Sequence, residues 1–266
     1  MSIQTLHTAA TGMSSMQSKL DVIANNLANM ETVGFKSGRA NFEDLFYHYD
    51  KYPGTQDSAS QFTPVGILLG MGSRLSSTQC NFQQGSSKTT GNDLDVAIQG
   101  QGFFQVKDPT GTVLYTRAGN FSKNANGQIV MGSANIGRLL EPAITIPVDA
   151  TKVVISSAGV VSVQQPNSQQ LQQIGQIELA NFINPEGLLK LGENLYSQSD
   201  ASGNPTLANP GLQGLGTLNQ GTLEQSNVDP VNELIDLIAT QRAFELNSQA
   251  VKAGDQMLQD VTGLIR

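Results

Sequence analysis

The chain has 266 residues, a net charge of −7 and 15 basic residues that form no run, so it offers no electrostatic reason to expect a nucleic-acid partner. Its longest apolar run, Ile67 to Met71 with a glycine inside it, is far shorter than the ~20 residues that a membrane-spanning helix needs, so membrane insertion is not expected. The single cysteine, Cys80, forbids an internal disulfide, and the low charged and aromatic fractions (14% and 6%) favour many turns and uncharged polar contact surfaces.

The first thirty residues carry apolar side chains at alternating spacings of three and four, the period of a helix in a coiled-coil seam. The positions on this seam are Ile3, Leu6, Ala10, Met13, Gln17, Leu20, Ala24 and Leu27. Because the seam is narrow and rich in small residues, it allows a close helix partner but little burial, and the helix is not expected to be stable alone. The stretch is polar at most positions and lacks an early Lys or Arg, so it does not have the pattern of a cleaved secretory signal.

Asn25, Asn26 and Asn29 come at the end of this predicted helix, on the side opposite the apolar seam. Neutral amides offer hydrogen-bond donors and acceptors without the desolvation cost of a charge, so we interpret them as polar contacts in a buried or half-buried surface. The alternative is that they fray and cap the helix ahead of Gly34, and this alternative is strongest for Asn29.

Residues 47–89 fit neither a helix nor a regular sheet, because Pro53, Pro64 and several glycines interrupt them. The segment also holds Tyr47 and Tyr52, and we predict an extended connector with room for two strands.

Short alternating runs divided by turn residues fill residues 90–222, which predicts a mainly antiparallel β domain. Turn signals fall at Asp108 to Gly111, at Asn126-Gly127 and at Ala158-Gly159.

Asp229 followed by Pro230 predicts the start of a C-terminal helix, since an acidic N-cap precedes a proline at the first helical position. The apolar stripe that follows runs to the end of the chain through Val231, Ile235, Ile238, Arg242, Leu246, Ala250, Ala253, Met257, Val261 and Leu264. Arg242 lies on this stripe, so either it pairs with an acid or it extends its charge to the edge of the stripe. Gly254 predicts a kink or a frayed turn.

The fold class expected from these patterns is α+β, with a discontinuous, coiled-coil-like helical domain built from both termini and a mainly antiparallel β domain. Four segments follow: 1–46 is the N-terminal helix and turn, 47–89 the connector, 90–222 the β domain, and 223–266 the C-terminal helix. Since two connectors leave and re-enter one β domain, the terminal helices are expected to meet in a separate unit.

The sequence forms no recognisable catalytic or metal site. Asp93 and Asp95 in "GNDLD" lack a second carboxylate pair or a histidine to complete one, so a turn entering a strand is the preferred interpretation. We therefore expect no enzyme activity, no cofactor and no metal. Two alternatives stay open: an enzyme acting on wall polysaccharide through Asp93 and Asp95, and a secreted β-rich binding module whose terminal helices form a trimeric stalk.

Several long motifs, in order, resemble those of the bacterial flagellar rod and hook proteins. They are "ANNLANMETVGFKSGRANFEDLFY", "DLDVAIQGQGFFQV", "YTRAGNFSKNANGQIV", "GENLY" and "SNVDPVNELIDLIATQRAFELNSQAVKAGDQMLQ". The resemblance covers nearly the whole chain. Length and the segment 47–66 are most similar to the distal-rod branch of this family, with proximal rod and hook proteins as the closest alternatives.

The resemblance implies a structural subunit that is exported by the flagellar type III apparatus and self-assembles in the basal body into a hollow helical tube, which carries torque from motor to hook. Its implied partners are further copies of itself, proximal rod proteins, the hook protein, the rings that surround the rod and the export apparatus. Within such a tube, the two apolar stripes would form subunit interfaces. Four polar residues, Asn25, Asn26, Asn29 and Arg242, would fix the register, and the segment holding Tyr47, Tyr52, Pro53 and Pro64 would brace neighbouring subunits.

Overall fold

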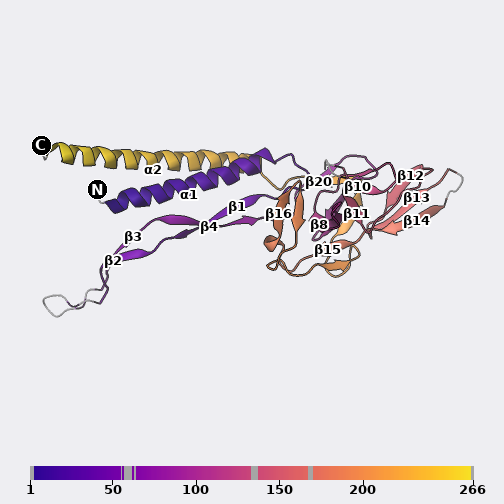
Figure 1. Ribbon diagram of the computed structural model, residues 1–266, viewed down its shortest axis with the longest axis horizontal. Helices are drawn as coiled ribbons and strands as arrows, with labels where there is room; N and C mark the ends of the chain where they lie inside the picture. The colour runs from indigo at the N-terminus through magenta and orange to yellow at the C-terminus, as the bar shows by residue number, and fades with distance from the viewer. Residues whose placement is uncertain are drawn as a thin grey trace. The chain divides into compact units, whose positions relative to one another are not determined.

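The computed structural model describes residues 3–54, 56, 62, 64–132, 137–166 and 170–264, and leaves out the side chains of Ile3, Leu258 and residues 261–264 (Figure 1). The chain forms two compact units. The helical unit comprises Met1–Ala28, Gly38–Gln79 and Asp229–Arg266, and the β unit comprises Asn29–Ser37 and Cys80–Val228. The predicted α+β class, with a helical part drawn from both termini, is confirmed; the four segment boundaries stay a prediction.

The helical unit contains two antiparallel helices, α1 (Ile3–Ala28) and α2 (Pro230–Leu264), which lie side by side with both chain ends at the same end of the pair (Figure 1). The predicted start of α2 is confirmed, because the Asp229 carboxylate accepts a hydrogen bond from the backbone N–H of Val231 at 3.0 Å. The helix continues through Gly254 to Leu264, so the frayed turn that was the alternative to a kink there is absent.

A long hairpin completes the helical unit. Strand β1 (Gly38–Asp44) pairs with β4 (Ser73–Cys80), and β2 (Tyr47–Lys51) pairs antiparallel with β3 (Ile67–Gly70). Hydrogen bonds from Leu45 N–H to the Gly72 carbonyl and from Met71 N–H to the Phe46 carbonyl join the two ladders, at 2.9 and 3.2 Å. The connector therefore holds more strands than expected, because β4 is polar and its side chains do not alternate between apolar and polar.

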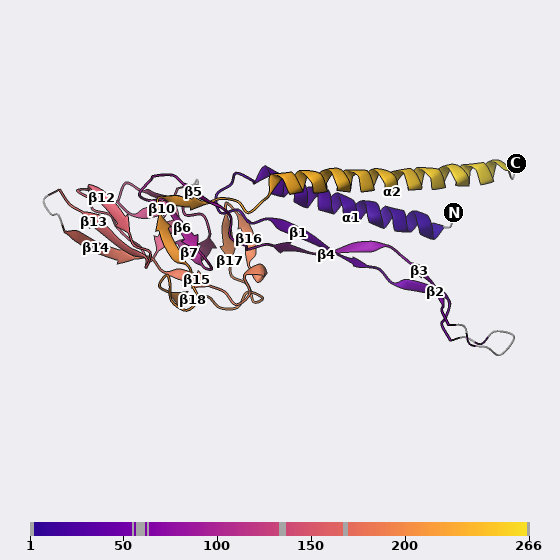
Figure 2. The ribbon, with the colours of Figure 1, turned by 180° about the vertical axis from the view of Figure 1, so that it is seen from behind.

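The β unit is built from short antiparallel strands, seen from behind in Figure 2. Their bounds are β5 (Ser87–Thr89), β6 (Val96–Gln99), β7 (Phe103–Lys107), β8 (Val113–Thr116), β9 (Phe121–Lys123), β10 (Ile129–Met131), β11 (Leu139–Glu141), β12 (Lys152–Ile155), β13 (Val160–Gln164), β14 (Leu171–Gln176), β15 (Leu179–Asn181), β16 (Leu189–Gly192), β17 (Leu195–Ser197), β18 (Thr206–Ala208), β19 (Thr217–Gln220) and β20 (Thr222–Glu224), with a 3-10 turn at Pro185–Gly187. The largest sheet has nine strands and runs β16-β17-β8-β7-β11-β10-β9, with β15 on β7 and β18 on β15. Strands β12, β13 and β14 form a separate sheet, and β6 pairs with β19 and β5 with β20.

The core of the β unit joins these sheets through one main cluster of buried aliphatic and aromatic side chains, including Val96, Phe104, Leu140, Val161 and Leu218. These five residues come from three different sheets, so their burial, which stabilises by roughly 1.5–3 kcal/mol per large side chain, depends on the sheets packing together.

The predicted turns between these strands are confirmed. Gly111 N–H donates to the Asp108 carbonyl at 2.8 Å, and Gly159 N–H donates to the Ser156 carbonyl at 2.9 Å. At Asn126-Gly127, the Gly127 N–H donates to the Asn124 carbonyl at 2.9 Å.

Candidate functional site

The contact between α1 and α2 includes small residues at which the two helices come close. A β-carbon added at Gly12 would lie 3.2 Å from Nδ2 of Asn247, and one added at Gly254 would overlap the end of the Leu6 side chain. Gly254 therefore leaves room for the Leu6 side chain of α1.

The buried side of α2 is a different stripe from the predicted one. At spacings of three and four, the residues on this side are buried or half-buried: Leu237, Thr240, Phe244, Asn247, Val251 and Gly254. Thr240 is only 2% exposed, and its hydroxyl donates to the Asp236 carbonyl at 2.6 Å. The pairing surface for α1 thus alternates apolar residues with small or polar ones, so a search for the most apolar stripe does not select it.

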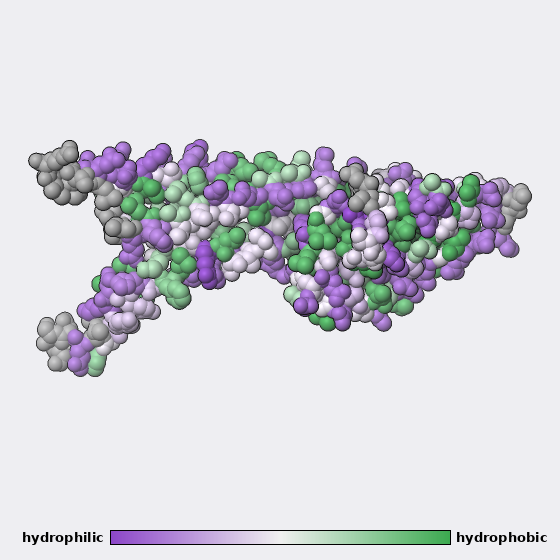
Figure 3. Space-filling view, viewed as in Figure 1, coloured by the Kyte–Doolittle hydropathy of each residue, from purple (hydrophilic) through white to green (hydrophobic). Residues whose placement is uncertain are grey.

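The predicted apolar stripe of α2 is exposed in the single chain. Its large side chains have exposed fractions from 41% to 66%: Val231, Ile235, Ile238, Leu246 and Met257. Figure 3 shows apolar side chains gathered over the part of the helical unit where α2 begins. A row of large apolar side chains left in water marks an interaction surface more often than chance exposure.

The predicted seam of α1 is divided. Leu6, Met13, Leu20 and Leu27 are half-buried, and Ala10 is exposed. The side chains of Ile3 at the start of α1 and Leu264 at the end of α2 lie outside the described residues. Whether the remaining seam residues contact another subunit stays a prediction.

Asn26 is buried, at 3% exposed, and joins three elements of the helical unit. Its side chain donates to the Gly38 carbonyl at 2.9 Å and accepts from the Gly38 N–H at 2.8 Å, and it also donates to the Glu233 carboxylate at 3.0 Å. The amide thus connects α1 to β1 and to the first turn of α2. Burial raises the pKa of the Glu233 carboxyl, with the Asn26 hydrogen bond acting in the opposite direction.

The other two asparagines have different surroundings. Asn25 is exposed on α1. Asn29 directly follows the last residue of α1, and its side-chain oxygen accepts from the Thr32 hydroxyl at 3.2 Å. This is the position that the capping alternative requires, and a role of either residue between subunits stays a prediction.

Arg242 pairs with Glu245 on the same helix at 3.0 Å, with both side chains more than half exposed (76% and 56%). An exposed pair three residues apart contributes little, typically about 0.3–0.5 kcal/mol. The predicted register contact of Arg242 with a second subunit stays untested.

The outer part of the hairpin, residues 46–71, exposes large apolar side chains on both faces, and we call it the arm. Phe46 is 89% exposed and Tyr52 62% exposed, and Tyr47 is 50% exposed. The rings of Tyr49 and Tyr52 stack at 4.9 Å with planes 3° apart. The predicted brace residues Pro53 and Pro64 are also exposed. An isolated two-stranded ribbon is marginally stable in water, so a covering surface would stabilise the arm.

The hairpin packs against α1 directly after the arm, where β4 begins. Gly72, with φ +117°, brings its backbone against Thr11, and a β-carbon there would overlap the Thr11 side chain. One residue further, the Ser73 and Ser15 hydroxyls lie 3.1 Å apart. Glycine is needed at position 72 for its backbone angle and for this close approach.

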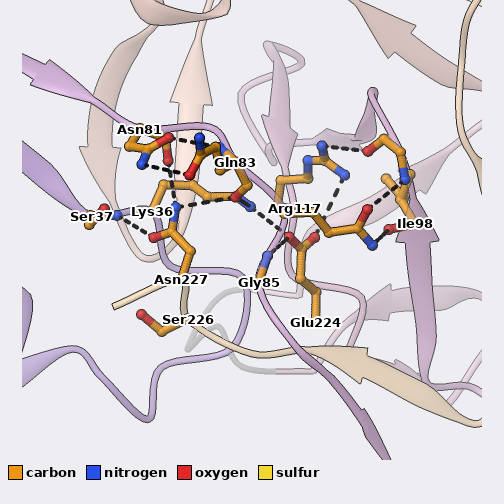
Figure 4. Close-up of polar contacts among 12 residues, drawn as sticks. Lys36, Ser37, Asn81, Gln83, Gly85, Ile98, Arg117, Glu224, Ser226 and Asn227 are labelled. Carbon is orange, nitrogen blue, oxygen red and sulfur yellow. Dashed lines mark hydrogen bonds and ion pairs between the residues drawn. The ribbon is translucent and has the colours of Figure 1, made fainter. Parts of the chain in front are cut away.

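A group of buried charges in the β unit escaped sequence reasoning. We call Lys36, Arg117 and Glu224 the Glu224 cluster; they are 0%, 4% and 1% exposed (Figure 4). One oxygen of Glu224 accepts from the Lys36 ammonium at 2.6 Å and from the Gly85 N–H at 3.0 Å, and the other lies 3.6 Å from an Arg117 nitrogen. Arg117 also donates to the Gly100 carbonyl at 2.8 Å. Burial lowers the pKa of both cations, and the Glu224 charge opposes that shift.

The acidic pair considered for catalysis serves the fold. Asp95 is 6% exposed and accepts from the Thr90 hydroxyl at 2.5 Å and from the Asn92 amide at 3.1 Å. The carbonyl of Asp93 accepts from the Gln220 amide at 2.8 Å. The preferred interpretation, a turn entering a strand, is confirmed. In the described part of the chain, no three His, Cys, Asp or Glu side chains gather as a metal site, and no described helix is long and apolar enough to span a membrane.

Comparison with known proteins gives three family matches in chain order. Residues 6–36 match the flagella basal body rod protein family, residues 97–163 the flagellar hook protein FlgE/F/G D1 domain, and residues 219–264 the C-terminal family of flagellar basal body rod FlgEFG proteins. The flagellar basal-body rod protein FlgG of Caulobacter vibrioides is 46% identical over 98% of this chain and 99% of its own length. The proteins of the same name from Buchnera aphidicola subsp. Baizongia pistaciae and Bacillus subtilis are 44% and 37% identical, over 98% and 99% of this chain and 99% and 100% of their own lengths.

Proposed function

Since the chain belongs to the family of flagellar basal-body rod proteins, we propose that it builds the distal rod by packing the exposed stripe of α2 against neighbouring copies. The chain is a structural subunit of the bacterial flagellum, located in the basal body, where it assembles with other axial proteins. The stripe supplies the energy of assembly, and the tube formed by successive copies transmits torque.

The observation that carries this proposal is the side of α2 on which the predicted stripe lies. Ile235 and Ile238 are 59% and 58% exposed, although α2 already has a partner in α1. The intramolecular contact uses the opposite side of the helix, around Thr240 and Gly254. A helix with one side paired within the chain and a second apolar side in water is suited to link subunits in an open, head-to-tail polymer.

The arm supplies a second surface for neighbours. Its exposed aromatic side chains, including Phe46, Tyr47 and Tyr52, and its two-stranded ribbon both gain from a covering partner. We assign that partner to an adjacent rod subunit, which the arm braces. We propose that Asn25, Asn29 and Arg242 are polar contacts that fix the register between subunits, and that Asn26 supports this register from within the subunit by joining α1 to β1 and α2. Proximal rod proteins, the hook protein, the surrounding rings and the export apparatus complete the set of partners.

We propose a non-enzymatic role, and the surroundings of Asp95 support it. Asp95 is committed to the turn that opens β6, and its carboxylate is already hydrogen-bonded to Thr90 and Asn92. The enzyme alternative needs wall-degrading activity that depends on Asp93 and Asp95, and a purified chain with no such activity removes it. The trimeric-stalk alternative predicts a closed trimer, which measurement of the oligomer by light scattering distinguishes from a growing polymer.

A truncation tests the proposal directly. Deleting the residues after Val251 removes Met257 from the stripe and Gly254 from the pair with Leu6, while the β unit is untouched. We expect a soluble chain with the strand content of the full protein and no polymer in electron micrographs. Normal assembly of the truncated chain would show that α2 does not have the proposed role.

A further inference from the structure

Three separate stretches of the β unit meet at the Glu224 cluster. Lys36 belongs to the stretch Asn29–Ser37, Gly85 to a stretch at the start of the segment Cys80–Val228, and Glu224 to a stretch at the end of that same segment (Figure 4). Each of the three stretches adjoins a point where the chain passes between the two compact units. The backbone of the first stretch is also bonded to Glu224, because Gly34 N–H donates to the Glu224 carbonyl at 2.8 Å.

Asn227 adds direct bonds between the same three stretches. Its side-chain oxygen accepts from Ser37 N–H at 2.8 Å, and its amide donates to the Asn81 carbonyl at 2.8 Å. Asn81 N–H in turn donates to the Ser37 carbonyl at 2.8 Å. Hydrogen bonds therefore link each of the three stretches directly to both of the others (Figure 4).

We infer that the buried Glu224 carboxylate makes these three stretches one cooperative element, which gains and loses structure as a whole. The carboxylate is the shared partner of the Lys36 side chain, of the Gly85 backbone and of Arg117, which follows β8 in the main sheet. Because all these atoms lie in the β unit, the inference does not depend on how the subunit assembles. Its consequence is that Ser37 and Asn227, the points from which the chain continues into β1 and α2, are held next to each other.

Charge balance gives the inference a specific signature. Replacing Glu224 by Gln leaves Lys36 and Arg117 buried without their shared carboxylate, and an uncompensated buried charge is strongly destabilising. Lys36→Met keeps the carboxylate beside Arg117, so it disturbs the stretches less. In the double variant a single buried cation remains, and we expect it to be less disturbed than Glu224→Gln alone.

Amide hydrogen exchange of the full-length chain measures this. In the natural protein, the amides of Gly34, Asn81 and Gly85 are hydrogen-bonded within the element and are expected to exchange at one common slow rate. In Glu224→Gln, all three are expected to accelerate together by roughly 100-fold or more, the scale of breaking a buried pair, while amides in the ladder between β7 and β8 keep their rates. A matched control is Glu193→Gln, which removes the 2.5 Å pair between Arg138 and Glu193 in the same unit.

The outcomes separate cleanly. Acceleration at Gly85 alone, equal acceleration of the β7 and β8 amides, or the same pattern in Glu193→Gln would each overturn the inference. If Glu224→Gln does not fold, the double variant with Lys36→Met is tested instead, and its recovery of the folded state supports the inference. The inference is overturned if the double variant also fails to fold and the three amides exchange at unrelated rates in Lys36→Met.

Discussion

Replacing Ile235 and Ile238 by serine should weaken assembly without harming the single subunit. The two residues retain 59% and 58% of their surface in water, so less than half of each is covered within the chain. Full burial of an isoleucine side chain contributes about 1.5–3 kcal/mol, so the exposed three-fifths leave about 1–2 kcal/mol per residue to be gained from a neighbouring subunit. The double variant should therefore lose about 2–4 kcal/mol per subunit added.

The measurable result is the concentration needed for polymer growth. Since each 1.4 kcal/mol corresponds to a factor of ten, the critical concentration should rise by roughly 30-fold to 1,000-fold. Purified wild-type and variant chains would be sedimented over a concentration series, and the helix content of the unassembled chain would be followed by circular dichroism. Serine and isoleucine have similar helix propensities, and exposed substitutions usually change stability by about 0.5 kcal/mol or less, so the spectrum should not change.

A matched control carries serine at Gln241 and Gln259, which are exposed positions on the same helix outside the apolar stripe. This control should polymerise at the wild-type concentration. An unchanged critical concentration for the isoleucine variant, or an equal rise for the glutamine variant, would refute the argument that the stripe provides the assembly energy. Loss of helix in the unassembled variant would refute the assignment of the stripe to the outer side of α2.

Two further predictions concern the interior of the helical unit. Gly72→Ala should destabilise the packing of the hairpin on α1 by about 1–3 kcal/mol, because the methyl group overlaps Thr11 at a φ of +117°; faster hydrogen exchange at the Met71 amide would register this, and unchanged exchange would contradict it. Burial raises the pKa of Glu233, so its contribution to stability is full below the ordinary carboxyl value of 4.5 and is lost as pH rises through the higher folded value. Glu233→Gln keeps an acceptor for Asn26, so it should reduce the fall in helix content as pH rises from the ordinary carboxyl pKa through the raised pKa of Glu233. An identical fall in both chains would show that another group is responsible.

The sequence predicted the two helices well and the side on which they pair poorly. Asp229 and Pro230 indicate the start of α2 by local chemistry that does not depend on the rest of the fold. The side that pairs with α1 carries the small or polar residues Thr240, Asn247 and Gly254. A search for apolar periodicity selects the more hydrophobic stripe instead.

The Glu224 cluster was missed for a different reason. Lys36 and Glu224 are 188 residues apart, and each stands in a polar stretch where charge ordinarily indicates exposure. Only the fold brings them together in a buried position. Asn26 is an intermediate case, since its amide was recognised as a buried polar contact, while its actual partners, Gly38 and Glu233, required the arrangement of three elements.

The bond between Ser37 and Asn227 joins residues 190 positions apart, and this has an entropic consequence for how α1 finds α2. Bringing together the ends of a loop of roughly 200 unfolded residues costs on the order of 4–5 kcal/mol plus a constant, by the logarithmic dependence of closure entropy on loop length. A folded β unit has already closed that loop. Only short stretches of chain then separate Ser37 from Ala28 at the end of α1, and Asn227 from Pro230 at the start of α2. During synthesis, or when the chain passes through a channel N-terminus first, α1 emerges first and α2 last. The folded β unit then brings the ends of the two helices close together, so the helices pair across short stretches of chain instead of across most of its length.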